Sequence, residues 1–338
     1  MVFHGPGDLR SEDLPVPEPA QGELVMRIDA ALTCGTDVKT LRRGHPVMIP
    51  KVPTVFGHEF AGTVASVGPG VSGFREGDRV VAANSAPCAH CYSCRAGRPN
   101  LCEDLLFVNG AYGEFILLPP RLVARNVVPL AASLPAERAA FAEPLACALL
   151  ATERVKIEAG QTVVVFGHGP LGCLLGMLAA SRNARVVMVG KSGWRFDRLK
   201  NLGFARWLDA TSTDNVAQAI RDVTNGRGAE VTVDATGRPE VWQQAVDAVG
   251  RGGSVLFFGG CATGTTISLD TRKTHYEELA LFGAFHHTPE TIRRAVETLT
   301  SGALVPDSLI SHRMPLEEVG QALALMAKGE ALKVSIRS

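Results

Sequence analysis

Four closely spaced cysteines are the first residues whose types and spacing point to metal chemistry. Cys88, Cys91, Cys94 and Cys102 follow the pattern C-x2-C-x2-C-x7-C in a turn-rich segment. Four thiolates on such a segment can converge on one tetrahedral zinc ion, and four protein ligands leave no open position. We therefore expect a closed, structural zinc site that orders its own loop. An iron–sulfur cluster is the main alternative, but the last spacing is seven residues and no proline follows Cys102, which favours zinc.

A second set of metal-binding residue types lies earlier in the chain. Cys34 stands in the run TCGTD, and His58 and Glu59 stand in the run GHEF. A catalytic zinc site takes about three protein ligands from separate segments and keeps one position for water or substrate. Cys34, His58 and a carboxylate would supply such a set. Taken singly, Cys34 is more simply explained as a buried cysteine, and His58 as a hydrogen-bonded core histidine, than as a metal ligand.

A glycine-rich run predicts a dinucleotide site. The residues GHGPLG follow an apolar stretch, TVVVF, and precede an apolar helix, which is the context that gives G-x-G-x-x-G its meaning. Gly167 permits the tight turn, Gly169 admits the pyrophosphate, and Gly172 allows close helix packing. The helix N-terminus offers free N–H groups to the phosphates. The loop residues that we assign to coenzyme binding are Gly167, Gly169, Pro170, Leu171 and Gly172.

The expected acid after the second strand of this unit is missing. Residues 185–189 lead into Gly190, Lys191 and Ser192, with Arg195 shortly after. Without a carboxylate to repel a 2′-phosphate, these side chains favour NADP over NAD, although a surface lysine is often simply solvated. Two later strand ends, DATG and FGG, should line the nicotinamide half of the site. They contribute Thr236, Phe258 and Gly259.

The elements that must position these residues change character along the chain. From Glu23 to about Pro120, short strands are broken by glycine and proline, which predicts a β-rich region. Its strands are expected at Glu23–Ala30, Phe60–Val67, Asp78–Ala83 and Glu114–Leu118. From about Pro135 a long apolar helix leads into alternating strands and helices, which indicates a doubly wound parallel sheet. Those strands are expected at Thr162–Phe166, Arg185–Val189, Glu230–Asp234 and Gly253–Phe258, and two tail helices at Pro289–Thr300 and Pro315–Lys328.

Composition narrows the classes of function. The 338 residues carry 34 basic and 34 acidic side chains, so net charge gives no reason to expect nucleic acid or an anionic membrane as partner. A small neutral ligand fits better. The first residues contain no apolar signal region, and no later run has the length of a membrane span, so we expect a cytoplasmic protein.

In their order along the chain, these motifs resemble the zinc-containing medium-chain dehydrogenases. The motifs that carry this resemblance are CGTD, GHE, GDRV, the four cysteines and the glycine loop, and the resemblance extends over essentially the whole chain. The resemblance implies a GroES-like catalytic domain at residues 1–147 and 285–338, with the zinc lobe at about 85–105. It further implies a Rossmann domain at residues 148–284, two zinc ions per chain, and a homodimer or homotetramer.

Within that family, Glu143 in AEPL resembles the glutamate of the polyol (sorbitol) and threonine dehydrogenase branch. The resemblance implies that Cys34, His58 and Glu143 bind the catalytic zinc, with Glu59 as an exchangeable or neighbouring group. A solvated helix position is the alternative for Glu143, but its neighbours are apolar and an unpaired carboxylate there would be costly. Whether Glu143 or Glu59 is the third direct ligand stays open.

The implied activity is hydride transfer between a secondary alcohol, most simply a polyol, and a nicotinamide coenzyme. Zinc would act as a Lewis acid on the substrate hydroxyl. Thr36 resembles the hydroxyl that passes the proton outwards, but the histidine of many relatives is replaced three residues later by Lys39. Further candidates for contacting substrate hydroxyls are Arg43, His45, His286 and His287.

Three other functions compete with this interpretation. A threonine-type amino-alcohol dehydrogenase would need an arginine in the substrate pocket. A non-catalytic, zinc-stabilised nucleotide-binding regulator would be expected to have lost Cys34, His58 or Thr36, and all three are present. A zinc-ribbon nucleic-acid module would need a basic stripe, whereas the four-cysteine segment has only Arg95 and Arg98.

Overall fold

The computed structural model describes residues 1–337, which form two compact units. The first unit comprises Met1–Ala146 together with the segment that begins at His287, and the second comprises Cys147–His286. Helix α5, Ala142–Arg154, contains the point at which the chain leaves the first unit. Across residues 1–337 we find no helix that combines the length and apolar character needed to cross a bilayer.

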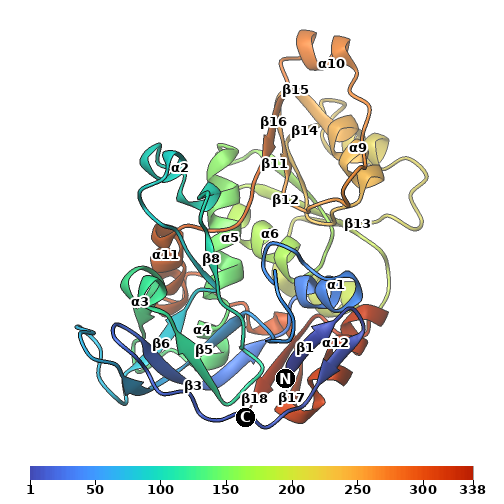
Figure 1. The fold of residues 1–338 in the computed structure, drawn as a ribbon. Coiled ribbons are helices and arrows are strands. Elements are labelled where there is room, and N and C mark those ends of the chain that lie inside the picture. Colours follow the sequence, from blue (N-terminus) through green and yellow to red (C-terminus); the bar gives the residue numbers. More distant parts are fainter. Residues whose placement is uncertain (338) are drawn as a thin grey trace. The chain divides into compact units, whose positions relative to one another are not determined.

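A seven-stranded sheet forms the centre of the first unit (Figure 1). Its order is β10-β6-β5-β3-β18-β17, and β9 also pairs with β3. Its strands are β3 Leu24–Leu32, β5 Glu59–Val67, β6 Arg79–Ala82, β9 Phe115–Leu118, β10 Val127–Pro129, β17 Ile310–Pro315 and β18 Lys333–Arg337. Most residues of β3 are buried, in keeping with its central place in the sheet. A smaller sheet, in the order β2-β1-β4, is built from β1 Val2–Gly5, β2 Asp8–Arg10 and β4 Thr54–Val55.

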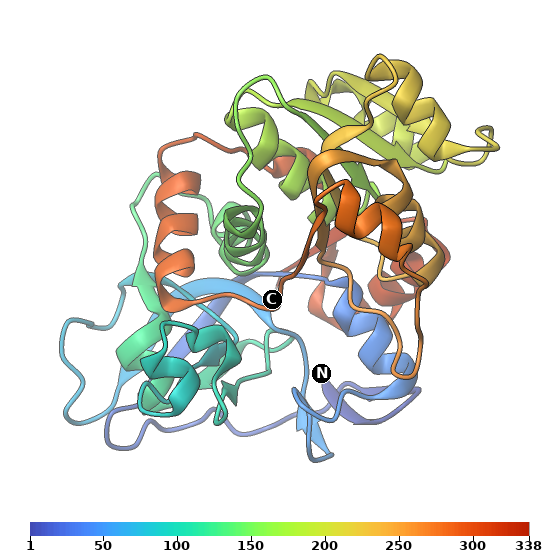
Figure 2. The same cartoon turned by 90° about the horizontal axis from the view of Figure 1, so that it is seen from above.

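Short helices surround this sheet. Helix α1, Gly35–Arg43, follows β3 directly and packs against α12, Val319–Lys328 (Figure 1). Helix α11, Pro289–Thr300, packs against α3, Pro120–Asn126, and α4, Ala136–Ala139 (Figure 2). The lobe that carries the four cysteines contains α2 Tyr92–Arg95, the 3-10 turn η1 Pro99–Leu101, and the short strands β7 Ser85–Ala86 and β8 Leu106–Phe107.

The second unit is a six-stranded parallel sheet with helical crossovers. Its order is β13-β12-β11-β14-β15-β16, so strand order reverses between β11 and β14. In such sheets, ligands bind beyond the carboxyl ends of the strands at this reversal. The strands are β11 Thr162–Phe166, β12 Arg185–Gly190, β13 Arg206–Asp209, β14 Ala229–Asp234, β15 Val249–Phe257 and β16 Ala280–Gly283. The helices are α6 Pro170–Ser181, α7 Trp194–Leu199, α8 Val216–Val223, α9 Pro239–Ala248 and α10 Thr271–Tyr276.

The predicted fold class, with one β-rich region and one parallel α/β sheet, is confirmed. The strand at Thr162–Phe166 and the helix at Pro289–Thr300 have the predicted bounds. The helix predicted at Pro315–Lys328 is wrong at its start: Pro315 closes β17, a 3-10 turn follows, and α12 begins at Val319. The long apolar helix predicted from Pro135 is broken into α4 and α5.

Candidate active site

Three strand ends of the first unit bring candidate ligands together. Strand β3 lies between β5 and β18, with Leu32 opposite Glu59 in one pairing and opposite Ser335 in the other. The chain therefore leaves β3 for Cys34 at the edge where β5 and β18 both begin. Hydrogen bonds link the edge further: Lys333 donates its ammonium to the Thr33 carbonyl at 3.0 Å, and Thr33 Oγ1 accepts the Val334 amide at 2.8 Å.

The sheet places one ligand atom each from Cys34, His58 and Glu59 within 4.8 Å of one another. His58 and Glu59 are buried and Cys34 is half-buried. A sulfur, an imidazole nitrogen and a carboxylate oxygen at this spacing can surround a single ion. Glu143, which is also buried, is not a member of this group within 4.8 Å. Burial lowers the pKa of Lys333, but Glu59 and Cys34 raise it by more, and Glu143 lies near enough to add a smaller increase.

Cys34 also begins helix α1. It is the N-cap residue, and its sulfur accepts the Thr36 amide at 3.4 Å. Asp37, three residues on, closes a capping box by accepting the Cys34 amide at 2.9 Å. The cap therefore fixes the backbone that carries the sulfur.

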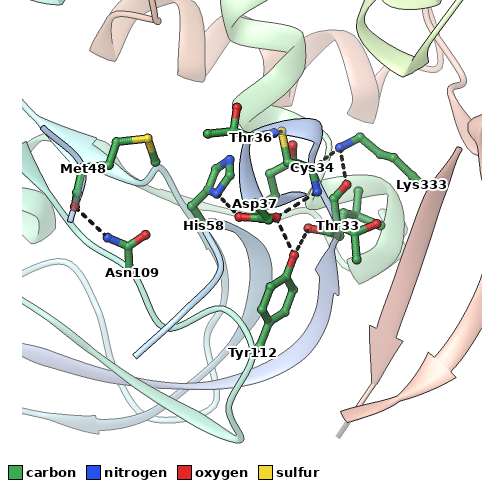
Figure 3. A network of polar contacts seen from close by, with 11 residues as sticks. Thr33, Cys34, Thr36, Asp37, Met48, His58, Asn109, Tyr112 and Lys333 are labelled. Carbon is green, nitrogen blue, oxygen red and sulfur yellow. Dashed lines mark hydrogen bonds and ion pairs between the residues drawn. The ribbon is translucent and has the colours of Figure 1, made fainter. Parts of the chain in front are cut away.

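Asp37 is the hub of the hydrogen bonds around His58 (Figure 3). Its Oδ1 lies 2.8 Å from His58 Nδ1, and its Oδ2 accepts the Tyr112 hydroxyl at 2.5 Å. Burial lowers the pKa of His58, but Asp37 and Cys34 raise it by more, to well above its ordinary value. With Nδ1 turned to the carboxylate, Nε2 is the nitrogen left to bind a metal, the arrangement common to histidine ligands in metal sites.

Glu59 and Lys333 form a fully buried ion pair. Lys333 Nζ donates to Glu59 Oε2, whereas Glu59 Oε1 is buried and has no hydrogen-bond partner within residues 1–337. Burial raises the pKa of Glu59, and the charge of Lys333 only partly offsets this. A buried carboxylate oxygen without a partner is costly unless a cation satisfies it. The donor set around Cys34 therefore fits a zinc ion, and Oε1 is the oxygen free to meet it.

The four-cysteine lobe has the geometry of a closed zinc site. One sulfur from each of Cys88, Cys91, Cys94 and Cys102 lies within 4.8 Å of the others. The Cys88–Cys94 and Cys91–Cys102 sulfur pairs are 4.0 and 3.9 Å apart. Sulfurs about 2.3 Å from a tetrahedral ion lie about 3.8 Å from each other, close to these values. Backbone amides of the lobe point at the sulfurs, including the Cys88 amide at 3.2 Å from Cys102.

The glycine loop of the second unit connects β11 to α6. Gly167 has a φ of 103°, and a β-carbon on it would lie 2.8 Å from Thr236 Cγ2. A β-carbon on Gly172 would collide with the Gly167 carbonyl, so both positions require glycine. Gly169 is the N-cap of α6, with open space beside its α-carbon, and Pro170 is the first helical residue. The loop thus leaves the helix N-terminus accessible to a pyrophosphate.

An acid that the sequence analysis missed lies beside the loop after β12. Gly190 ends β12, where the dinucleotide-binding pattern would have an acid, and it is the register partner of Asp209 on β13. Asp209 Oδ1 accepts the Ser192 amide at 3.0 Å and the Thr211 hydroxyl at 2.6 Å, and these bonds lower the pKa of Asp209. Lys191 and Ser192 are exposed, and Arg195 is half-buried. Arg195 contributes, after burial, to the lowered pKa of His168 in the glycine loop.

A buried aspartate organises the two later strand ends. Asp234, at the end of β14, accepts the Thr236 hydroxyl at 2.6 Å and the Gly237 amide at 3.0 Å. It also accepts the Trp242 indole N–H at 2.9 Å. A β-carbon on Gly259 would lie 2.6 Å from this carboxylate, so the turn after Phe258 packs directly on it. The side chain of Asp234 thus shapes the backbone that we predicted to line the coenzyme site.

The other residues that the sequence analysis proposed near the substrate differ in exposure and in hydrogen bonding. Thr36 is half-buried in the first turn of α1, while Lys39 and Arg43 are exposed. His45 Nδ1 accepts the Met48 amide at 3.1 Å. His287 is buried, with Nε2 3.0 Å from Asn84 Oδ1, which indicates a structural role. Sequence analysis missed Asp37, Tyr112 and Lys333 around the candidate metal site of the first unit, and Asp209 beside the loop after β12 in the second unit.

Comparisons with known proteins agree with this geometry. Residues 20–130 match the model of the alcohol dehydrogenase GroES-like domain, and residues 170–301 match that of zinc-binding dehydrogenases. An erythritol/L-threitol dehydrogenase from Mycolicibacterium smegmatis is 32% identical, with 99% of this chain and 96% of the relative covered. The chain belongs to the zinc-dependent medium-chain dehydrogenase family. Like its family, it is an oxidoreductase.

Other family members place the chain near the polyol dehydrogenases. A sorbitol dehydrogenase from Bombyx mori is 34% identical and covers 99% of this chain and 97% of its own length. A zinc-binding dehydrogenase from Sinorhizobium meliloti, solved with NADP bound, superposes with a TM-score of 0.91 at 28% identity. That alignment covers 100% of this chain and 98% of the solved one. The resemblance to the polyol branch that Glu143 implied is therefore confirmed at the level of the family.

Proposed function

We propose that this protein oxidises a secondary hydroxyl of a polyol, or reduces the matching ketone, with zinc and a nicotinamide coenzyme. The observation that carries the proposal is the convergence of Cys34, His58 and Glu59, with one buried Glu59 oxygen lacking a hydrogen-bond partner within residues 1–337. That set has a position to spare for a substrate oxygen, as catalytic zinc sites require. The relatives named as erythritol/L-threitol and sorbitol dehydrogenases support polyols as the substrate class.

The residues of the first unit have two proposed roles, zinc binding and orientation of the zinc ligands. Cys34 and His58 would hold the ion directly, Glu59 would bind it through Oε1, and Glu143 would be the alternative carboxylate, reached directly or through water. Zinc at this position supplies Lewis-acid activation of an alcohol hydroxyl. Lys333 holds the second oxygen of Glu59, and Asp37 holds the imidazole of His58. The Glu59 carboxylate and the His58 imidazole are thereby kept in fixed orientations before substrate arrives.

Thr36 is proposed to pass the substrate proton outwards. It follows the Cys34 ligand by two residues and is half-buried at the start of α1. Its hydroxyl can both accept and donate a proton. Lys39 stands at the place where many relatives carry a histidine and is exposed on the same helix, but an ammonium cannot accept a proton, so we assign the last step of the relay to no residue.

We propose NADP as the preferred coenzyme, bound to the glycine loop of the second unit. Support comes from Lys191, Ser192 and Arg195, which follow β12 with no acid at the end of that strand itself. The NADP-bound relative from Sinorhizobium meliloti is in keeping with this choice. Asp209 argues in the other direction, but its Oδ1 is already engaged by Ser192 and Thr211. Thr236, Phe258 and Gly259 are proposed to line the nicotinamide half.

We propose two zinc ions per chain, the second in the four-cysteine lobe, and a homodimer or homotetramer in solution. The sulfur spacing of 3.9 to 4.0 Å supports the lobe site. Strand β16 stands at an edge of the parallel sheet, where a second copy of the chain can pair with it, which supports association at that edge. Light scattering during size-exclusion chromatography tests the oligomer.

Turnover of a substrate panel tests the function. The zinc-loaded protein is mixed with sorbitol, erythritol, threitol, 2,3-butanediol and L-threonine, each with NAD and with NADP, and the absorbance of the reduced nicotinamide is followed. We expect turnover of at least one polyol and a lower KM for NADP. Turnover of threonine alone would mean that the substrate is an amino alcohol and not a polyol. No turnover in protein with two zinc equivalents would favour a regulatory protein.

A further inference from the structure

Tyr112 is the buried tyrosine of the three in the chain. It is 1% exposed, whereas Tyr92 and Tyr276 are 76% and 74% exposed. It lies three residues before β9, and its hydroxyl reaches Asp37, 75 residues away in sequence, at 2.5 Å. Burial and the charge of Asp37 raise the pKa of Tyr112 well above its usual value, so the phenol remains a donor. A buried phenol that donates to a buried carboxylate has a defined orientation.

The carboxylate that Tyr112 binds connects two candidate zinc ligands. Asp37 Oδ1 faces the His58 imidazole, and Asp37 Oδ2 accepts the backbone amide of Cys34 as well as the phenol. A rotation of this carboxylate about its Cβ–Cγ bond would therefore change its contact with His58 and its contact with the Cys34 amide at the same time. Three groups contact Asp37: the His58 imidazole, the Cys34 amide and the Tyr112 hydroxyl. Only the hydroxyl comes from outside the segments that carry the candidate ligands (Figure 3).

The ring of Tyr112 is fixed as firmly as its hydroxyl. Gly57, the residue before His58, has a φ of 90°, and a β-carbon there would lie 2.7 to 2.9 Å from the tyrosine ring. The ring of Phe56 also packs against that of Tyr112, with ring centroids 6.0 Å apart. The Met1 ammonium donates to the Tyr112 carbonyl at 2.6 Å. The hydroxyl is thus presented to Asp37 from a rigid support.

We propose that Tyr112 is a positioning residue of the catalytic zinc site, acting through Asp37 to hold His58 and Cys34 in their metal-binding arrangement. The inference rests on the proposed role of Cys34 and His58 as zinc ligands. Loss of the phenol would leave Asp37 Oδ2 with the Cys34 amide alone, so the carboxylate would be freer to turn. The ion would then have to fix that orientation itself, at the expense of binding free energy.

A purely structural Tyr112 would make a different prediction. If the ring only filled space against Gly57 and Phe56, phenylalanine would serve as well, because it keeps every ring contact. Tyr112→Phe therefore removes the hydroxyl and little else. Asp37→Asn keeps the shape of the hub but removes its charge, and Tyr276→Phe removes an exposed phenol in the second unit.

Zinc affinity of the full chain is the deciding measurement. The four proteins, and the double variant Tyr112→Phe/Asp37→Asn, are titrated with zinc against a chromophoric chelator, and the cobalt-substituted forms are compared by visible absorption. For Tyr112→Phe we expect about tenfold weaker binding at the Cys34 site and an altered cobalt spectrum, without change at the four-cysteine lobe. Asp37→Asn should lose about 10- to 100-fold, and the double variant no more than Asp37→Asn alone.

Each outcome decides one question. A zinc Kd for Tyr112→Phe within twofold of the parent overturns the positioning role, as does an additive loss in the double variant. If the parent protein binds zinc in the lobe alone, the proposed zinc function fails, and the inference fails with it. If Tyr112→Phe does not fold by circular dichroism while Asp37→Asn does, the hydroxyl serves folding and the proposal is overturned.

Discussion

Lys333 donates a hydrogen bond to Glu59 across 274 residues of sequence, and both side chains are almost fully buried. The two residues begin strands β18 and β5, which lie on either side of β3. Strand β18, close to the C-terminus, therefore reaches a group of candidate ligands, Cys34, His58 and Glu59, that come from the first sixty residues. A buried ion pair of this kind stabilises only while both partners are present.

Substitution Lys333→Met should leave Glu59 as an uncompensated buried charge. We expect the zinc-free protein to lose roughly 3–5 kcal/mol of unfolding free energy, measured by urea titration. Added zinc should restore part of the loss, because Oε1 would then face a cation. The matched control is Lys333→Met/Glu59→Gln, which removes both charges and should be more stable than Lys333→Met alone. A single variant within about 1 kcal/mol of the parent would contradict the account.

Removal of either proposed zinc should have separate consequences. Cys91→Ser should lower the zinc content from two equivalents to one and reduce the thermal midpoint, because the lobe has little apolar core of its own. Cys34→Ser should remove the other equivalent and abolish turnover while leaving the lobe metal in place. Elemental analysis and thermal scans check both. Loss of both ions from either variant would show that the two sites are not independent.

The sequence predicted best what depends on local pattern. The bounds of β11 and α11, the glycine loop and the four-cysteine lobe follow from apolar runs, turn residues and fixed spacings. The predicted start of α12 is wrong because Pro315 suits the first position of a helix, whereas in the structure it closes β17 and is the register partner of Arg337 on β18. Propensity could not decide between these two roles, since the pairing joins distant segments.

What the sequence could not predict depends on contacts between distant strands. Asp37 had a signal, because an acid three residues after an N-cap completes a capping box. Lys333 carries only a weak signal, as a lysine among apolar residues, and Tyr112 carries none. Asp209 was missed because the acid sought after β12 stands at the end of the neighbouring strand, opposite Gly190.

Lys191 is expected to distinguish the two coenzymes. Lys191→Ala should raise the KM for NADP about tenfold, the effect of losing one charge-assisted hydrogen bond, and leave the KM for NAD nearly unchanged. Lys200→Ala is a suitable control, because Lys200 is also exposed and its ion pair with Asp197 spans 3.5 Å. Steady-state kinetics with both coenzymes provide the measurement. Equal changes for NADP and NAD would defeat the assignment.

Glu137 should make stability depend on pH. Its carboxylate, at the start of α4, accepts hydrogen bonds from Arg313 at 2.9 Å, Ser335 at 2.8 Å and Arg337 at 2.7 Å. Burial raises the pKa of Glu137, but these three donors lower it by more, to below its ordinary value of 4.5. A lowered pKa means that the stabilisation is complete above about pH 4.5 and is lost as pH falls towards the folded-state value.

Substitution Glu137→Gln tests this dependence on pH. At pH 7 we expect a loss of about 1 kcal/mol, because both arginines are more than half exposed and solvent screens their charge. Below pH 4.5 the difference from the parent should shrink, since protonation has then removed the same charge. Glu240→Gln is the control: Glu240 pairs with Arg238 at the surface, so its loss should change the thermal midpoint little at either pH. A Glu137→Gln deficit that stays constant between pH 7 and pH 3 would mean that packing, and not the carboxylate charge, ties α4 to β17 and β18.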